Sequence, residues 1–300
     1  MGTTATGKTD AAASIVDAFD AQIISVDSSL VYRGMNIGSA KPDTEFLERY
    51  PHHLVDIRHP NETYSVAEFY SDCIELIKKI TERGCIPVLA GGTHFYFNAL
   101  EQGMANLPKA DAELRDRISK EAQKTGWAKQ HARLAEIDPQ SAQRIDCMDA
   151  QRIQRALEIV ITGGQPVSSY NSSRHKAFDN PLLKIALCFS DRWILHDRIE
   201  RRFDIMLEQG LKQEVEKLLE NGVRGDSPSM RMIGYRQMLE HLNGDLNWDE
   251  MRKKGVVATR QLAKRQLTWL RNQANVVWWV DQGLQKKDFK DLITFIDAYY

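Results

Sequence analysis

The chain of 300 residues opens with Gly2-Thr3-Thr4-Ala5-Thr6-Gly7-Lys8-Thr9, which matches the pattern G-x-x-x-x-G-K-[ST] of a phosphate-binding loop. In such a loop the glycines let backbone N–H groups turn toward phosphate oxygens. Lys8 places a positive charge on the terminal phosphates, and the Thr9 hydroxyl can bind Mg²⁺. A helix that begins at the loop directs its positive end toward the same anion. The pattern therefore predicts an α/β protein that binds a diphosphate or a nucleotide such as ATP.

A phosphate-binding loop ordinarily follows a buried strand, and here only Met1 precedes Gly2. Without that strand the loop lacks its usual support within a parallel sheet. We therefore expect the strand to be encoded upstream of Gly2.

The composition excludes several classes of protein. The chain is 42% hydrophobic and 27% charged with a net charge of −1, which indicates a globular protein without a uniformly basic surface. Its four cysteines are scattered, which argues against a zinc site or a disulfide framework and favours the cytoplasm. No apolar run approaches about 18 residues, so we expect no membrane span. Nothing in the sequence requires more than a monomer.

Four apolar runs predict buried parallel strands, at 22–26, 86–90, 184–189 and 276–280. Helical stretches separate them, including 66–83, 94–100, 193–209 and a basic stretch over 251–275. This alternation predicts an α/β fold with a P-loop nucleoside-triphosphate-hydrolase-like core and a parallel sheet.

The strand pattern stops over 110–163, where three helix starts predict an all-helical insertion domain. Asp111, Asp138-Pro139 and Asp149 are suitable N-terminal caps, and Gly163-Gly164 ends the last helix. We therefore expect a core formed by 1–109 and 164–300, interrupted by this insertion. The polar stretch 166–181 is typical of a linker.

Two sequence positions follow predicted strands and could carry chemistry. Asp27 comes directly after the strand 22–26, at the sheet edge where ligands bind in open α/β folds. It could act as a general base or bind a Mg²⁺-bound water, or it could simply cap a helix or form a turn. Gly91-Gly92-Thr93 follows the second strand and suggests either a close approach to a ligand or a tight turn.

Arginines on two predicted helices suggest anionic ligands. Arg198, Arg201 and Arg202 could face phosphates, or form i,i+4 ion pairs on a solvated surface. The stretch 251–275 has seven basic residues and no acidic one, and Lys253, Arg260, Lys264 and Arg271 share one helical stripe. This favours a polyanionic partner over a merely solvated basic face. The segment 228–237 combines arginines with Tyr235 and suits stacking on single-stranded bases.

In this combination and order, the motifs resemble those of bacterial tRNA dimethylallyltransferases, also called tRNA isopentenyltransferases. The resemblance covers nearly the whole chain. It rests on residues 2–9, 25–32, 34–42, 91–93, 149–152, 234–237 and 259–266. Thr3 stands where the family usually has proline, and Ser29-Leu30 replaces its common Arg-Gln pair.

The resemblance implies transfer of a dimethylallyl group from dimethylallyl diphosphate to N6 of the adenosine adjacent to the anticodon on its 3′ side. The implied tRNAs read codons that begin with U. Asp27 matches the general base, Arg202 an arginine that stabilises the leaving diphosphate, and Thr93 and Arg115 residues of the target-base channel. Gly2 to Thr9 match the diphosphate site, with Thr9 at Mg²⁺. The matches to tRNA-contacting parts are Asp27, Ser28, Ser29, Leu30, Thr93, Arg115, Gln151, Arg152, Ile153, Gln154, Arg155, Arg231, Met232, Ile233, Gly234, Tyr235, Arg236, Lys264, Arg265, Gln266, Leu267, Thr268, Trp269, Leu270 and Arg271.

Two other functions fit parts of the sequence. A small-molecule kinase that uses ATP explains the phosphate loop and Arg202, but it leaves the basic stretch 251–275 without a role. A non-catalytic RNA-binding module that responds to a nucleotide explains the basic stretch and leaves Asp27 without one.

Overall fold

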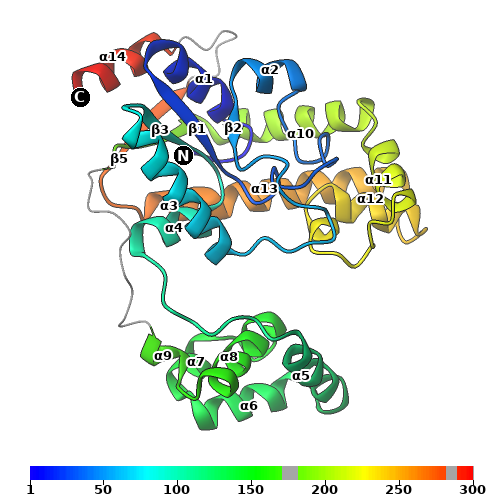
Figure 1. Cartoon of the computed structure of the whole chain (residues 1–300). Coiled ribbons are helices and arrows are strands. Elements are labelled where there is room, and N and C mark those ends of the chain that lie inside the picture. Colours follow the sequence, from blue (N-terminus) through cyan, green and yellow to red (C-terminus); the bar gives the residue numbers. More distant parts are fainter. Residues whose placement is uncertain (171–181, 282–288, 300) are drawn as a thin grey trace. The chain divides into compact units, whose positions relative to one another are not determined.

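The structure is a computed structural model that describes residues 1–170, 182–281 and 289–299 (Figure 1). The chain forms two compact units, Met1–Phe97 with Asn180–Tyr300, and Asn98–Asp179. The second unit is longer at both ends than the helical insertion expected over 110–163. Contacts at both ends account for the extra length. Before residue 110 the Pro108 carbonyl accepts a hydrogen bond from Arg155, and after residue 163 Val167 packs on the core of this unit.

All strands of the first unit run parallel, as the sequence predicts, and they form two sheets. One has the order β2-β1-β3, and the other pairs β4 with β5. The strands are β1 (Ala21–Val26), β2 (His52–His53), β3 (Ile86–Gly91), β4 (Lys184–Phe189) and β5 (Val276–Asp281). The four strands predicted from apolar runs are confirmed. The prediction missed β2, because two residues are too short to show a pattern.

The phosphate loop starts between the two sheets. Gly2 forms a parallel bridge with Leu187 of β4, whose N–H donates to the Met1 carbonyl at 2.9 Å. On its other side Gly2 faces Gly92, which follows β3: a Cβ added at Gly92 would lie 3.3 Å from the Gly2 carbonyl oxygen. The loop therefore begins beside β4 of one sheet and the end of β3 of the other.

Helices cover the strands of the first unit (Figure 1). In chain order they are α1 (Lys8–Ala18), α2 (Thr44–Arg49), α3 (Val66–Glu82), α4 (His94–Gln102), α10 (Arg192–Glu208), α11 (Leu211–Glu220), the 3₁₀ turn η2 (Ser229–Arg231), α12 (Tyr235–Leu242), α13 (Trp248–Arg271) and α14 (Lys290–Tyr299). Small side chains let α1 approach both sheets: Ala12 and Ala13 pack near Ile23, and Ala11 packs near Leu187. The helix that follows the phosphate loop is thus fixed to the strands that carry the site.

Helix α13 packs against α10 and α12 along its length. It begins with a capping box, in which Asn247 accepts from the Glu250 N–H and Glu250 accepts from the Asn247 N–H. Ala263 on its inward face packs with Leu195 and Ile199 of α10 and with Ala5 of the phosphate loop. One helix therefore joins the long packed face of the unit to the loop.

The second unit is helical, with α5 (Ala112–Thr125), α6 (Trp127–Ile137), α7 (Pro139–Arg144), α8 (Ala150–Gly163) and α9 (Val167–Tyr170). The predicted caps are confirmed, because Asp111, Asp138 and Asp149 each accept a hydrogen bond from the backbone N–H three residues on. Of the expected linker 166–181, residues 167–170 form α9, and residues 171–181 lie outside the described part of the chain. Within the part that the structure describes, no helix combines the length and apolarity needed to cross a bilayer.

Candidate active site

The phosphate loop is closed by contacts to the Thr3 carbonyl. This oxygen accepts from the Thr6 hydroxyl at 2.8 Å and from Lys8 Nζ at 2.6 Å. Ala5 and Gly7 have φ values of 63° and 81°, in the left-handed region. Residues of this conformation turn successive N–H groups to one side and form a concave anion-binding surface. Because α1 begins at Lys8, its N-terminal end lies at the same place.

The end of β1 brings four predicted residues together. Asp27 Oδ1 accepts from the Ser29 backbone N–H at 2.9 Å and from the Ser29 hydroxyl at 2.5 Å. Thr93 donates its N–H to the Val26 carbonyl, and its hydroxyl oxygen accepts from the Ser28 N–H at 3.0 Å. The turn after β3 is thus joined to the residues that flank Asp27. Asp27 itself is partly exposed, so its carboxylate is both oriented and accessible.

The three arginines of α10 that the sequence singled out have different surroundings. Arg201 is exposed and pairs with Asp197 one turn earlier, as expected for a solvated face. Arg198 Nε donates to the Ala5 carbonyl in the phosphate loop at 3.1 Å. Burial lowers the pKa of the Arg202 guanidinium, and the Asp27 carboxylate acts in the opposite direction. Since arginine keeps its proton at neutral pH, α10 supplies positive charge both to the loop and to Asp27.

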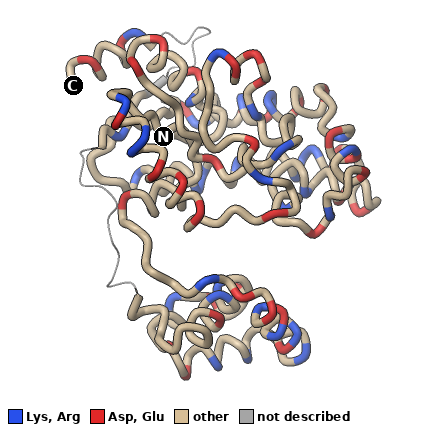
Figure 2. Tube along the Cα trace, in the orientation of Figure 1, with Lys and Arg blue, Asp and Glu red and all other residues tan. Residues whose placement is uncertain are grey.

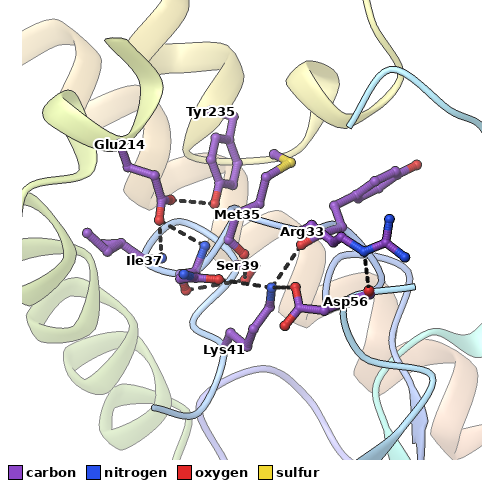
Figure 3. A network of polar contacts seen from close by, with 10 residues as sticks. Arg33, Met35, Ile37, Ser39, Lys41, Asp56, Glu214 and Tyr235 are labelled. Atoms are coloured by element: carbon purple, nitrogen blue, oxygen red, sulfur yellow. Dashed lines mark hydrogen bonds and ion pairs between the residues drawn. The ribbon is translucent and has the colours of Figure 1, made fainter. Parts of the chain in front are cut away.

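A single carboxylate holds the segment that follows β1 (Figure 3). Glu214 of α11 accepts from the N–H groups of Asn36 and Ile37, both at 2.8 Å, and of Gly38 at 3.1 Å. The Tyr235 hydroxyl donates to the same carboxylate at 2.6 Å. Four donors satisfy this carboxylate, so the segment is fixed against α11 and α12.

The remainder of this segment is held by Lys41 (Figure 3). Its ammonium group donates to the Tyr32 carbonyl at 2.8 Å and to Asn36 Oδ1 at 3.0 Å, and it pairs with Asp56. Arg202 reaches the Ala40 carbonyl at 3.4 Å from the other side. The segment is therefore held in place next to the Arg202 side chain.

The structure corrects the expectation that Tyr235 offers a stacking surface to bases. Its side chain is completely buried, and burial together with the neighbouring Glu214 raises its pKa. A Cβ added at Gly38 would lie 2.6 Å from the Tyr235 ring, so this position requires glycine. Arg231 and Arg236 of the same predicted segment are exposed, while Gly234 is buried.

The predicted segment Lys264–Arg271 divides into two faces. Lys264, Arg265, Thr268 and Arg271 are exposed, whereas Gln266 and Leu270 are buried. Trp269 stacks on His94, with ring centroids 4.7 Å apart. Burial lowers the pKa of His94 to about 4, and the charges of Lys8 and Arg265 add to this shift. His94 is therefore neutral at physiological pH, beside the lysine of the phosphate loop.

The basic stripe predicted on α13 is only partly available. Arg260 pairs with Glu200 of α10 at 2.6 Å, and Arg252 pairs with Glu200 and Asp204. Across residues 1–170, 182–281 and 289–299, Lys253, Lys264, Arg265 and Arg271 form no ion pair with a carboxylate. Figure 2 shows basic and acidic residues interspersed along the chain. The exposed basic residues of this helix without a carboxylate partner in the described residues are thus Lys253 near its start and three residues in its last two turns.

The second unit carries the other predicted tRNA-contacting residues. Arg115 and Arg155 both donate to the buried carboxylate of Glu158, at 3.0 and 2.7 Å. Burial alone would raise the pKa of Glu158, but these hydrogen bonds and one from the Asp111 N–H outweigh it and lower the pKa. Gln154 donates to the Arg115 carbonyl and to Ser119, and Ile153 is fully buried. Gln151 and Arg152 are exposed, so they are the side chains of this segment that face solvent.

The donor set at the sheet edge fits Mg²⁺ in one particular way. Within the described residues no three His, Cys, Asp or Glu side chains converge as ligands. Mg²⁺ prefers oxygen ligands, keeps several waters, and is often held by one or two protein groups together with substrate phosphates. The Thr9 hydroxyl at the start of α1 and the accessible Asp27 carboxylate would each offer an oxygen ligand of this kind.

Sequence reasoning missed Glu214 and the inward position of Gln266. Gln266 lies three residues after Ala263 and four before Leu270, so a polar residue interrupts an apolar stripe. That interruption is a signal in the sequence. Glu214 has no comparable signal, because three of its four donors, the N–H groups of Asn36, Ile37 and Gly38, lie 176 to 178 residues away along the chain.

Comparison with known proteins gives a consistent result. The family model described as IPP transferase matches residues 30–273. A tRNA dimethylallyltransferase of Thiobacillus denitrificans is 52% identical over 278 residues, which cover 92% of this chain and 89% of that protein. A tRNA dimethylallyltransferase of Legionella pneumophila is 46% identical over 285 residues, which cover 95% of this chain and 91% of that protein.

Solved structures agree with these relatives. The tRNA isopentenylpyrophosphate transferase of Bacillus halodurans superposes with a TM-score of 0.70 at 38% identity, covering 99% of this chain and 93% of that one. A eukaryotic dimethylallyltransferase acting on tRNA superposes with a TM-score of 0.77 at 26% identity, covering 93% of this chain and 72% of that one.

Proposed function

Because the chain belongs to the IPP transferase family, we propose that it transfers a dimethylallyl group from dimethylallyl diphosphate to N6 of an adenosine in tRNA. The observation that carries this proposal is a convergence at one sheet edge. There the phosphate loop, Asp27 and Arg202 lie together, and one helix, α10, contacts both the loop and the surroundings of Asp27. The adenosine adjacent to the anticodon on its 3′ side, in tRNAs that read codons beginning with U, is the proposed target.

In the proposed reaction the N6 amine attacks C1 of the dimethylallyl group. The bond between C1 and the diphosphate oxygen breaks, and the diphosphate leaves with the electron pair. The amine is a poor nucleophile because its lone pair is delocalised into the ring, so loss of its proton must accompany attack. The accessible oxygen of Asp27 is the proposed acceptor of that proton, while the Ser29 hydrogen bonds orient the carboxylate.

Departure of the diphosphate builds negative charge, which this chain is equipped to stabilise. Lys8 and the start of α1 would face the leaving group, and the partly buried Arg202 would add positive charge. Mg²⁺, held by Thr9 and the diphosphate, would neutralise part of this charge when bound. Thr93, whose hydroxyl oxygen accepts a hydrogen bond from the Ser28 N–H, is proposed to line the entry of the target base.

The proposed tRNA surface consists of the exposed basic residues. Lys264, Arg265 and Arg271 at the end of α13 suit the phosphates of the anticodon stem. Arg231 and Arg236 of the same unit are exposed as well. In the second unit Gln151 and Arg152 are exposed, and they are proposed to contact tRNA separately. A base inside a stem-loop must leave its stack to reach Asp27, so an extruded nucleotide is expected. The functional unit is proposed to be a monomer.

The kinase alternative receives no support from the comparisons, all of which point to tRNA prenylation. A transfer assay tests the proposal. The protein is incubated with Mg²⁺, radiolabelled dimethylallyl diphosphate and unmodified bulk tRNA, and label in tRNA is counted. Label that enters tRNA and depends on Mg²⁺ is the expected result. No label in tRNA, together with ATP consumption on adding small acceptors, would overturn it.

A further inference from the structure

The side chain of Gln266 is turned away from the proposed tRNA surface. It lies on the inward face of α13, between the buried residues Ala263 and Leu270, and is only 5% exposed. Its neighbours Lys264 and Arg265 face solvent. A side chain in this position cannot contact tRNA directly, although the segment that contains it resembles a tRNA-contacting one.

The Gln266 amide joins two loops of the site. Its Oε1 accepts from the Thr4 backbone N–H at 2.7 Å, and its Nε2 donates to the Gly92 carbonyl at 2.9 Å. Thr4 lies in the phosphate loop, and Gly92 immediately precedes Thr93. Thr4 and Gly92 lie 262 and 174 residues from Gln266 along the chain, so α13 connects two segments that are distant from it in the sequence.

These contacts require a side chain that accepts one hydrogen bond and donates another, as an amide does. The Thr4 N–H can only donate, and the Gly92 carbonyl can only accept, so one neutral group must offer both an acceptor and a donor. Gly92 is fitted to this contact as well, because a Cβ there would lie 2.6 Å from Gln266 Nε2. Oε1 and Nε2 of the buried amide therefore each form a hydrogen bond to one of the two loops.

The contact also determines what the phosphate loop can offer to a ligand. The Thr4 N–H is engaged by Gln266, and the Ala5 carbonyl is engaged by Arg198 at 3.1 Å. The outer half of the loop is thus held from α13 and α10. The start of α1 at Lys8 follows Thr4 and Ala5 along the chain, and an anion would bind at this helix end.

We infer that Gln266 is a positioning residue, which fixes the phosphate loop relative to the turn that carries Thr93. The expected effect on the transfer rate rests on the proposed function, whereas the positioning of the loop by Gln266 does not. A displacement of about 1 Å between donor and acceptor sites slows a bimolecular transfer severely. Loss of the amide is therefore expected to reduce the transfer rate and diphosphate affinity, with tRNA affinity retained.

The variant Gln266→Glu tests the hydrogen-bond pattern. When ionised, the new carboxylate accepts from Thr4 but repels the Gly92 carbonyl; when protonated, it accepts and donates as the amide does. Burial raises the pKa of a carboxyl group, which brings this protonation into a measurable range. His94, with its pKa lowered to about 4, stays neutral above pH 5.5 and does not obscure the change.

The measurements are single-turnover transfer and inorganic diphosphate affinity from calorimetry, each divided by the wild-type value at the same pH. For Gln266→Glu we expect values about 10- to 100-fold low at pH 8, recovering to within about threefold at pH 5.5. Gln266→Leu should be low throughout this range. Gln261→Glu, with the same charge change at an exposed position of α13, should show no such recovery.

Three results would overturn the inference. They are a Gln266→Glu ratio that does not change with pH, Gln266→Leu values close to wild type, or a loss of tRNA affinity in filter binding as large as the loss of rate. Thermal unfolding at each pH identifies a variant that does not fold, and Gln266→Leu then carries the test. If the wild type binds diphosphate but transfers nothing, the proposed function fails while the affinity ratios still test the role of Gln266.

Discussion

Both halves of α13 carry basic residues, but the arginines of the first half are used differently from the basic residues at the end of the helix. In the first half, Arg252 forms two hydrogen bonds to Asp204 and one to Glu200, and Arg260 at the middle pairs with Glu200 again. In the last two turns, Lys264, Arg265 and Arg271 are exposed, and within the described residues they lie near no carboxylate at ion-pair distance. The difference is set by α10, whose acidic residues reach only the first part of α13.

A count of basic residues therefore overestimates the positive charge that is available to a partner. The first half of α13 uses its arginines to hold α10, which carries Arg198 and Arg202 to the site. The second half uses its inward face to hold the phosphate loop and presents its basic residues to solvent. One helix thereby connects the proposed tRNA surface to the proposed donor site.

The proposed difference between the two halves is tested most strongly by removing the exposed basic residues of the last two turns together. In the variant Lys264→Ala, Arg265→Ala, Arg271→Ala we expect tRNA affinity to fall about 10- to 100-fold at low salt, because each residue is proposed to neutralise one phosphate. The slope of log affinity against log salt should become shallower by about three. Filter binding at several salt concentrations measures both. An unchanged slope would return these residues to the role of a solvated face.

A smaller effect is expected from the first half of the helix. Arg252→Met removes a partly exposed guanidinium from two carboxylates and should lower the free energy of unfolding by about 1 kcal/mol. Because Arg252 is occupied within the protein, the salt slope of tRNA binding should not change.

Urea unfolding and the same binding series test this second expectation, and the triple variant serves as the opposite control. A shallower salt slope for Arg252→Met would show that the ion pairs with α10 open in the complex, and the two halves would then act alike.

Local patterns in the sequence predicted much of this molecule. The four longer strands, the caps at Asp111, Asp138 and Asp149, and the positions of Asp27 and Thr93 at strand ends all depend on residues close together in the chain. The features that the sequence did not predict depend on residues that are far apart along the chain. The burial of Tyr235 requires Glu214, and the pairing of Arg252 and Arg260 requires the acidic residues of α10. Periodicity places such residues on a helix face, but it does not show what lies opposite.

The central claim is that Asp27 accepts the proton of the amine during dimethylallyl transfer. Asp27→Asn tests it most directly, because an amide oxygen can still accept the hydrogen bonds from Ser29 while it no longer takes up a proton. The measurement is the single-turnover transfer rate at saturating donor, with tRNA affinity determined on the same preparation. The account predicts a rate about 10²- to 10⁴-fold lower and an affinity within about threefold of wild type. A rate close to wild type, or an affinity that falls in parallel with the rate, would contradict it.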